Sequence, residues 1–275
     1  MTRKADLLAI DMDGTLLRND NTLSKRNIEA VHAFHEAGGK VFLISGRPDG
    51  MTLPYVAELE DVDLYASFNG AYFGNKKGEV LWSKTIEEAT LKRIFTGLCE
   101  REYSFSFLGK DGLYSNWGSF AVFEKQAQLA ISLAKKHGLP EIWIRPFGED
   151  FLSHLPDIYK IVIFKKNTEE DYILYHALET DEELTVTSSR PFMYDLSRKG
   201  VGKGDTLLRC ERILGIEKER TCVLGDYYND LVMFPHAGIR IAMGNSPDDV
   251  KKAADHVVSS NEEDGVAEAI ERYLL

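Results

Sequence analysis

AIDMDGTLL, residues 9–17, joins an apolar run to a turn that carries two aspartates, Asp11 and Asp13. A short apolar run that ends at turn-forming residues is typical of a β-strand buried on both faces. Two carboxylates this close together repel each other unless a proton or a cation lies between them. The stretch therefore predicts a buried strand with a charged site at its carboxyl end.

The segments after this stretch alternate between helical and strand patterns. We expect a helix from about Leu23 to Ala37, with Ser24 as its N-cap, followed by a strand from Lys40 to Ile44. Two strands joined through a helix lie parallel in one sheet. The same alternation returns near the C-terminus, with an expected helix at 203–214 and a strand at 221–224.

The middle of the chain has a different order, because its strand patterns come in pairs between helical ones. That order is typical of an antiparallel sheet with helices packed against it. The fold class that we predict is α/β, a Rossmann-like parallel-sheet core with an inserted α+β cap domain. The expected domains are the discontinuous core, residues 1–83 and 190–275, and the cap, residues 84–189. Within the cap we expect helices at 86–101, 121–137 and 168–178, and strands at 104–108, 112–115, 159–164 and 184–187.

Composition argues against several classes of partner. The chain has 275 residues and a formal net charge of -11, which does not favour binding to nucleic acid or to an anionic membrane surface. No apolar run approaches the length of a transmembrane helix. The cysteines, Cys99, Cys210 and Cys222, are odd in number and widely spaced, which is typical of reduced thiols. We expect a cytoplasmic protein that is a monomer or a homodimer.

Four polar clusters follow predicted strands or begin a predicted helix. They are Asp11–Thr15, Ser45–Arg47, Lys203 and Gly225–Asp230. In an open parallel sheet, ligands bind outside the carboxyl ends of the strands. We therefore expect these clusters to converge at one edge of the core sheet.

The residue types in these clusters suit phosphoryl transfer. Asp11 and Asp226 supply oxygen ligands of the kind that Mg2+ prefers. The Asp11 carboxylate can also attack phosphorus and form an aspartyl-phosphate, with Lys203 offsetting the negative charge. A second acid must give a proton to the leaving oxygen and later accept one from water, and Asp13 is the candidate.

Several groups are candidates for holding the phosphate. Ser45, the backbone amides of Ser45 and Gly46, and those of the turn Met12–Gly14 can donate to its oxygens, and Asn229 is a further neutral donor. We interpret Arg47 differently and expect it to pair with a carboxylate of the core rather than to contact substrate.

These motifs resemble those of the haloacid dehalogenase (HAD) superfamily, whose phosphatases use an aspartate nucleophile. The matching motifs are DxDGT at Asp11–Thr15, the strand-end Ser45, the isolated Lys203 and GDxxND at Gly225–Asp230. DMDGTLL, ISGRP, NGA (Asn69–Ala71), GVGKGDTL and the tail from AMGNSPDD to NEEDGV are similar to the Cof-type subfamily (class IIB). Members of that subfamily carry a large α/β cap of type C2B, so the resemblance agrees with the inserted domain.

The resemblance implies a role for each matching residue. Asp11 would be the nucleophile and a Mg2+ ligand, and Asp13 the general acid and base, with its backbone carbonyl also on the metal. Asp226 would complete the metal site, and Asp230 would hold the metal ligands in place without binding the metal itself. The phosphate would be bound by the Met12 amide and by Ser45, Gly46, Lys203 and Asn229.

The activity that the resemblance implies is Mg2+-dependent hydrolysis of small phosphorylated metabolites, such as sugar phosphates or phosphorylated cofactors. A cap above the metal excludes bulky substrates and must open for product release. Two alternatives remain open. A phosphomutase of the phosphomannomutase type would return the phosphoryl group to a sugar, and a non-catalytic phospho-acceptor or binding module would retain it. Tyr227 and Tyr228, beside the predicted metal ligand, occupy positions at which family members vary.

Overall fold

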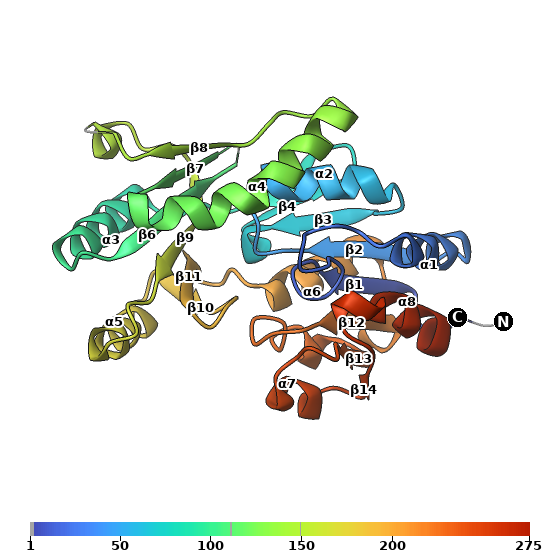
Figure 1. Ribbon diagram of the computed structural model, residues 1–275. Coiled ribbons are helices and arrows are strands. Elements are labelled where there is room, and N and C mark those ends of the chain that lie inside the picture. The colour runs from blue at the N-terminus through green and yellow to red at the C-terminus, as the bar shows by residue number, and fades with distance from the viewer. Residues whose placement is uncertain (1–2, 111, 149) are drawn as a thin grey trace.

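The described residues of the computed structural model form two β-sheets with helices packed on them (Figure 1). The description covers residues 3–110, 112–148 and 150–275, with the backbone alone at 117–122 and 125. An eight-stranded sheet forms the core lobe and a six-stranded sheet forms the cap. The predicted fold class, an α/β core with an inserted cap, is confirmed.

The core sheet has β1 near its middle, with strands from both halves of the chain beside it. Its order is β14-β13-β12-β1-β2-β3-β4-β5. The pairs from β14 to β3 are parallel, whereas β4 and β5 are antiparallel to their neighbours. The strands are β1 (Leu7–Asp11), β2 (Lys40–Ile44), β3 (Leu64–Ser67), β4 (Tyr72–Asn75), β5 (Val80–Ser83), β12 (Thr221–Gly225), β13 (Ile239–Ala242) and β14 (His256–Val257).

Helices on both faces of the core sheet explain the continuous apolar pattern of β1. Leu8 and Ile10 belong to the apolar cluster that includes α1 (Lys25–Glu36) and α2 (Asp49–Leu59). Leu7 and Ala9 belong to the cluster on the opposite face, which includes α6 (Lys203–Leu214). A strand covered on both faces has no side for solvent, so every position is apolar until the chain reaches the sheet edge.

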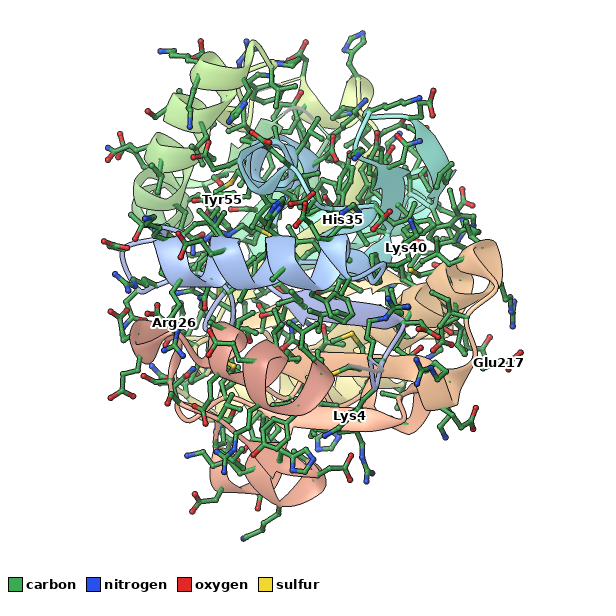
Figure 2. All side chains as sticks on the ribbon, turned by 90° about the vertical axis from the view of Figure 1, so that its right-hand side faces the viewer. Lys4, Arg26, His35, Lys40, Tyr55 and Glu217 are labelled. Carbon is green, nitrogen blue, oxygen red and sulfur yellow. The ribbon has the colours of Figure 1, made fainter. Side chains whose placement is uncertain are left out.

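Helix α1 begins where the sequence predicts. Ser24 Oγ accepts a hydrogen bond from the backbone N of Asn27 at 3.0 Å and so caps the first turn. Figure 2 shows α1 crossing one side of the molecule, with Arg26 and His35 toward its two ends. The remaining core helices are α7 (Asp248–Ala253) and α8 (Gly265–Ala269), the latter continuing as a π-helical turn (Ile270–Leu274).

The cap sheet has the order β10-β11-β9-β6-β7-β8, and its pairs are antiparallel except for β7 and β8. One face packs against α3 and α5. The other face, with α4, lies toward the core lobe, where α4 contacts α2 (Figure 1). The elements are α3 (Glu88–Glu100), β6 (Ser104–Gly109), β7 (Gly112–Ser115), α4 (Trp117–His137), β8 (Trp143–Pro146), β9 (Ile158–Phe164), α5 (Glu169–Glu179), β10 (Leu184–Thr187) and β11 (Met193–Arg198). Within the described residues, no helix has the length and apolar character needed to cross a membrane.

One strand, β11, lies in the cap, although the predicted domain bounds place its residues in the core. β11 pairs with β9 and β10 in the cap sheet, whereas we placed the residues from 190 onward in the core. The predicted boundary at residue 190 is therefore wrong, because an apolar alternation shows that a strand exists but not which strand it pairs with. Strand β8 was not predicted at all. It is a short edge strand that ends at Pro146, and such a segment has little pattern to read.

The chain order reverses beside β1. The connection through α1 places β2 on one side of β1, and β12 lies on the other side. In open α/β sheets, the ligand crevice forms at the carboxyl edge where the order reverses in this way. Asp11 ends β1 and Gly225 ends β12, so both polar clusters that follow these strands lie at this edge.

Candidate active site

Asp11, the last residue of β1, lies against the lysine that the sequence singled out. The residue is 5% exposed, and its Oδ1 accepts a hydrogen bond from Lys203 Nζ. Lys203 begins α6, is itself 1% exposed, and also donates to Asp230 Oδ1 at 2.6 Å. A buried ammonium group is tolerated only when it is fully paired, and here two carboxylates pair with it. The structure thus brings three predicted site residues together beneath the sheet edge.

The loop after β12 carries Asp226, and Asp230 fixes the shape of this loop. Asp230 Oδ2 accepts hydrogen bonds from the backbone N atoms of Asp226 (2.9 Å) and Tyr227 (3.0 Å). On the other side of the loop, Thr15 Oγ1 donates to Asp226 Oδ1 at 3.3 Å. Asp230 therefore has both of its carboxylate oxygens engaged within the protein.

Gly14 allows the turn after β1 to approach Asp226 closely. Its φ is +79°, in the region that favours glycine, and a Cβ at this position would lie 2.7 Å from Asp226 Cγ. Asn245 Nδ2 donates to the Gly14 carbonyl at 2.8 Å and lies 3.5 Å from Asp226 Oδ2. Asn245 belongs to the C-terminal motif quoted above, although we predicted no role for it.

The three aspartates form a group that fits a metal ion, because one carboxylate oxygen of each lies within 4.8 Å of the others. Asp230 is already engaged, so Asp11 and Asp226 are the better candidates for ligands. Carboxylate oxygens are hard donors of the kind that suit Mg2+.

Burial raises the pKa of both Asp11 and Asp226, and the charge of neighbouring carboxylates adds to the shift. A bound cation would offset this unfavourable charge. That the Asp13 backbone carbonyl contributes a ligand stays a prediction.

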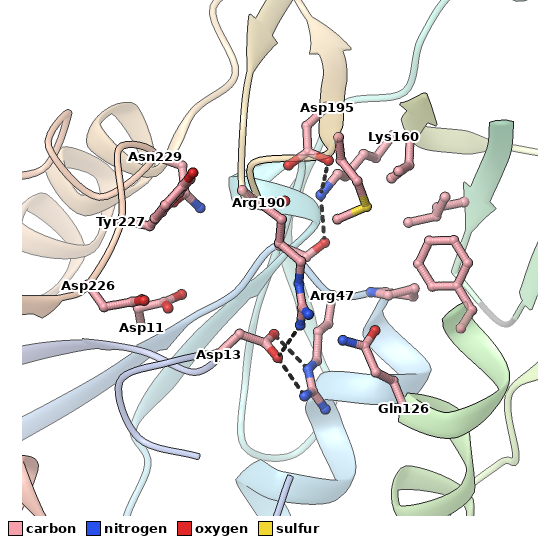
Figure 3. Close-up of a pocket in the computed structure, with 17 residues that line it drawn as sticks. Asp11, Asp13, Arg47, Gln126, Lys160, Arg190, Asp195, Asp226, Tyr227 and Asn229 are labelled. Carbon is pink, nitrogen blue, oxygen red and sulfur yellow. Dashed lines mark hydrogen bonds and ion pairs between the residues drawn. The ribbon is translucent and has the colours of Figure 1, made fainter. Parts of the chain in front are cut away.

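Asp13 turns its carboxylate toward two arginines (Figure 3). Arg47 donates from Nε to Oδ2 at 2.8 Å and from Nη2 to Oδ1 at 2.7 Å, and Arg190 Nη2 lies 3.4 Å from Oδ1. Burial alone would raise the pKa of Asp13, but the guanidinium groups outweigh it and lower the pKa to about 2. The prediction that Arg47 pairs with a core carboxylate is confirmed, and that carboxylate is the predicted acid and base itself.

The residues predicted to hold phosphate lie around this pair. Ser45 is buried, and its Oγ accepts a hydrogen bond from the backbone N of Arg47 at 3.1 Å. Gly46 and Asn229 line a cavity above the site. The Met12 side chain packs in the core, which leaves its backbone as the part available to a ligand. The phosphate-binding roles themselves stay predictions.

A cavity of about 60 Å³ lies between the core and the cap, above these groups. Asp11, Asp13 and Asp226 line it from the core, together with Tyr227, whereas Tyr228 is exposed to solvent. Its cap side includes four residues that the sequence did not identify (Figure 3), namely Gln126, Lys160, Arg190 and Asp195. A signal for two of them was present, because Lys160 and Asp195 interrupt the apolar strand patterns IYKIVIF and MYDLSR.

The fold and the site together define a capped α/β enzyme whose acidic centre lies at the edge of a parallel sheet. Residues 8–270 match the haloacid dehalogenase-like hydrolase family, and the chain therefore belongs to this family. The resemblance stated from the motifs, and with it the expectation of a hydrolytic enzyme, is confirmed.

Relatives of this family cover nearly the whole chain. A putative phosphatase of Bacillus subtilis, YxeH, is 30% identical over 98% of this chain and 98% of its own. The 5-amino-6-(5-phospho-D-ribitylamino)uracil phosphatase YcsE of the same organism is 29% identical over 98% of this chain and 96% of its own. A solved haloacid dehalogenase-like hydrolase from B. subtilis has a TM-score of 0.84 at 28% identity, covering 98% and 100% of the two chains. A solved HAD subclass IIB sugar phosphatase has a TM-score of 0.80 at 26% identity, covering 98% of each.

Proposed function

We propose that the protein is a Mg2+-dependent phosphatase that hydrolyses small phosphorylated metabolites through an aspartyl-phosphate on Asp11. One observation carries the proposal: Asp11, at the end of β1, is held by Lys203 beside Asp226 and opens onto a cavity under the cap. The names of the relatives support the same activity, since they include a sugar phosphatase and a phosphatase of a ribityl phosphate.

The residues divide the reaction into two displacements. The Asp11 carboxylate attacks phosphorus and forms an O–P bond, while the ester P–O bond breaks and the leaving alkoxide takes a proton from Asp13. In the second displacement, water gives a proton to Asp13 and attacks phosphorus, which breaks the bond to Asp11 and releases inorganic phosphate. Lys203, with the donors of Ser45, Gly46 and Asn229 and the Met12 amide, would hold the phosphate oxygens. A magnesium ion held by Asp11 and Asp226 would supply positive charge to the phosphate when bound.

The pairing of Asp13 with Arg47 favours one of its two roles. As a base toward water, Asp13 must be ionised, and the guanidinium keeps it so. As an acid toward the leaving oxygen, it must carry a proton, which the same ion pair opposes. We therefore assign to Arg47 a positioning role that favours hydrolysis of the aspartyl-phosphate.

We expect the substrates to be small because the site lies between the core and the cap, which leaves no room for a bulky substrate such as a phosphoprotein. Sugar phosphates and phosphorylated cofactors with short chains fit this condition. The free cysteines agree with a reducing compartment, and we place the enzyme in the cytoplasm.

Phosphate release from p-nitrophenyl phosphate tests the proposal directly. The protein should release phosphate with Mg2+, lose this activity in EDTA, and regain it when Mg2+ is added back. The Asp11→Asn variant should be inactive under all three conditions. Activity that survives both EDTA and this substitution would rule out the proposed mechanism, and transfer of phosphate to a sugar instead of water would indicate the phosphomutase alternative.

A further inference from the structure

The cap contributes a buried ion pair to the wall of the cavity. Lys160 on β9 and Asp195 on β11 are 3% and 0% exposed, and Lys160 Nζ lies 3.0 Å from Asp195 Oδ1. Both residues line the cavity that contains Asp11 and Asp13 (Figure 3). A buried charge pair is a poor source of stability compared with apolar side chains of the same volume. Its presence in an otherwise apolar strand pattern calls for another explanation.

This pair reaches the predicted phosphate-binding loop. Lys160 Nζ donates to the Gly46 carbonyl at 3.1 Å, and a Cβ on Gly46 would lie 3.2 Å from the same nitrogen. Asn69 Nδ2, from the core, donates to Asp195 Oδ2 at 3.3 Å. The ammonium and the carboxylate are therefore held next to the loop that we predict to bind the phosphate.

The ammonium of this pair retains hydrogen-bonding capacity for a ligand. An ammonium has three protons to donate, and within the described residues Lys160 Nζ has two partners, Gly46 and Asp195. Asp195 Oδ1 is close to the ammonium but, among the same residues, receives no well-aligned hydrogen bond. The pair thus has one spare donor, on Lys160, whereas Asp195 Oδ1 is itself buried behind the ammonium.

The pair has no net charge, and most of the cap wall around it is apolar. The exceptions include Gln126 and Arg190, and Arg190 turns toward Asp13. Leu108, Phe123, Val162 and Met193 complete the cap side around the pair. A second phosphate or a carboxylate gains little from an ammonium that Asp195 already neutralises, whereas a neutral hydroxyl group can accept its spare proton. Such a wall suits a neutral, hydroxylated carbon chain. A larger cavity of about 360 Å³ that shares Asp13, Arg190 and Tyr227 adjoins the first and gives room for the rest of that chain.

We propose, on the basis of the phosphatase function above, that Lys160 and Asp195 are the specificity-determining pair for the alcohol part of the substrate. Lys160 donates to a hydroxyl oxygen near the phosphate, and Asp195, buried beside the ammonium, holds it in place and neutralises its charge. The substrate class is a phosphate monoester of a polyol or a sugar without a second anionic group.

The test compares hydroxylated and unhydroxylated esters in one preparation. The probes are ribose 5-phosphate, 2-deoxyribose 5-phosphate, sorbitol 6-phosphate, 3-phosphoglycerate and p-nitrophenyl phosphate, each assayed for kcat/KM with Mg2+. The variant is the double substitution Lys160→Gln with Asp195→Asn, which removes both charges and leaves neither residue as an unpaired ion. The control is Lys92→Gln with Glu88→Gln, an exposed cap pair whose atoms lie 2.6 Å apart.

The wild-type enzyme should prefer the best polyol or sugar phosphate over both p-nitrophenyl phosphate and 3-phosphoglycerate. The double variant should lose about 10- to 100-fold in kcat/KM on that substrate, the range expected for lost hydrogen bonds to charged groups. Its loss on p-nitrophenyl phosphate, which uses the loop that Lys160 contacts but has no aliphatic hydroxyl, should be several-fold smaller than this. The control should change neither value, because exposed pairs contribute little. The ratio of two substrates in one preparation is independent of the folded fraction. If the double variant is too unstable to purify, Asp195→Asn alone provides the same ratio.

Equal losses on all substrates would show that the pair only joins the lobes or binds phosphate, and would overturn the inference. So would a wild-type enzyme that hydrolyses p-nitrophenyl phosphate but does not prefer hydroxylated esters, or that prefers 3-phosphoglycerate. Failure of the wild-type enzyme to hydrolyse any ester is a different outcome, because it contradicts the phosphatase function itself.

Discussion

Replacing Lys203 with methionine tests whether the lysine holds the acidic centre together. In the structure its ammonium lies between Asp11 and Asp230, and all three side chains are buried. Removing one partner of a buried charge cluster leaves uncompensated charge, which typically costs about 3–5 kcal/mol. We expect Lys203→Met to lower the free energy of unfolding by about that amount at pH 8 in EDTA, and to abolish phosphatase activity.

The cost should depend on pH in a defined direction. Burial already raises the pKa of Asp11 while Lys203 lowers it, so the substitution raises that pKa further. A carboxyl group whose pKa is higher in the folded protein than in the unfolded chain destabilises the fold as pH rises through the folded value. The loss in Lys203→Met should therefore be larger at pH 8 than at pH 5. The difference should reach about 1.4 kcal/mol, because the wild-type pKa is about 7 and only one unit of additional shift lies below pH 8.

Urea unfolding at the two pH values provides the measurement, with metal excluded. Lys92→Met is the matched control, since Lys92 pairs with Glu88 at the surface and should change stability by less than about 1 kcal/mol. Adding Asp230→Asn to Lys203→Met removes one of the two stranded carboxylates and should recover part of the loss. A Lys203→Met protein with near wild-type stability at pH 8, or with the same loss at pH 5 and pH 8, would refute the reasoning.

Three further substitutions test neighbouring groups. Asp13→Asn should slow turnover by about 10²–10⁴-fold, the usual contribution of acid–base catalysis, while phosphate still binds in equilibrium titration; unchanged turnover would exclude Asp13 from proton transfer. Gly14→Ala should weaken Mg2+ activation by about 10- to 100-fold, because its Cβ displaces Asp226, whereas Gly215→Ala, at φ +66° with open space around it, should leave Mg2+ activation unchanged. Arg47→Met should raise the pKa of Asp13 from about 2 to above its ordinary 3.8. An NMR titration of the Asp13 carboxyl carbon measures this change. In the wild-type protein, the stability that this ion pair contributes is present above pH 4 and is lost as the pH falls toward 2, and Arg47→Met should lack that acid-dependent loss.

The core side of the site could be predicted because strand direction determines where polar residues gather. Asp11 ends a buried strand, Ser45 and Asp226 each follow one, and parallel strands place their carboxyl ends at one edge. Lys203 joins them because α6 begins at the same edge. None of these placements requires knowledge of a distant side chain, and the structure brings all four residues to that edge.

The partner of Asp13 was only half predictable. A buried arginine needs a carboxylate, so the expectation that Arg47 pairs within the core follows from its chemistry. Which carboxylate it selects depends on the turn after β1, where Asn21 Oδ1 also accepts from Arg47 Nη2 at 2.6 Å. Arg190 reaches the same carboxylate from the segment between β10 and β11, a contact that spans the two lobes and has no local signature.

The wrong domain boundary and the failure to identify Asp195 have one physical cause. We assigned the segment from residue 190 to the core because the alternation of strand and helix patterns returns there, and so Asp195 was not considered as part of a cap wall. The pairing of β11 with β9 reverses that assignment: it places Asp195 opposite Val162 and beside Lys160, on the face that lies over Asp11. Strand pairing over long sequence distances therefore determines more than the lobe boundary here. It also determines which charged residues face the substrate, and this is why the acidic centre could be read from motifs while the groups proposed to select the alcohol could not.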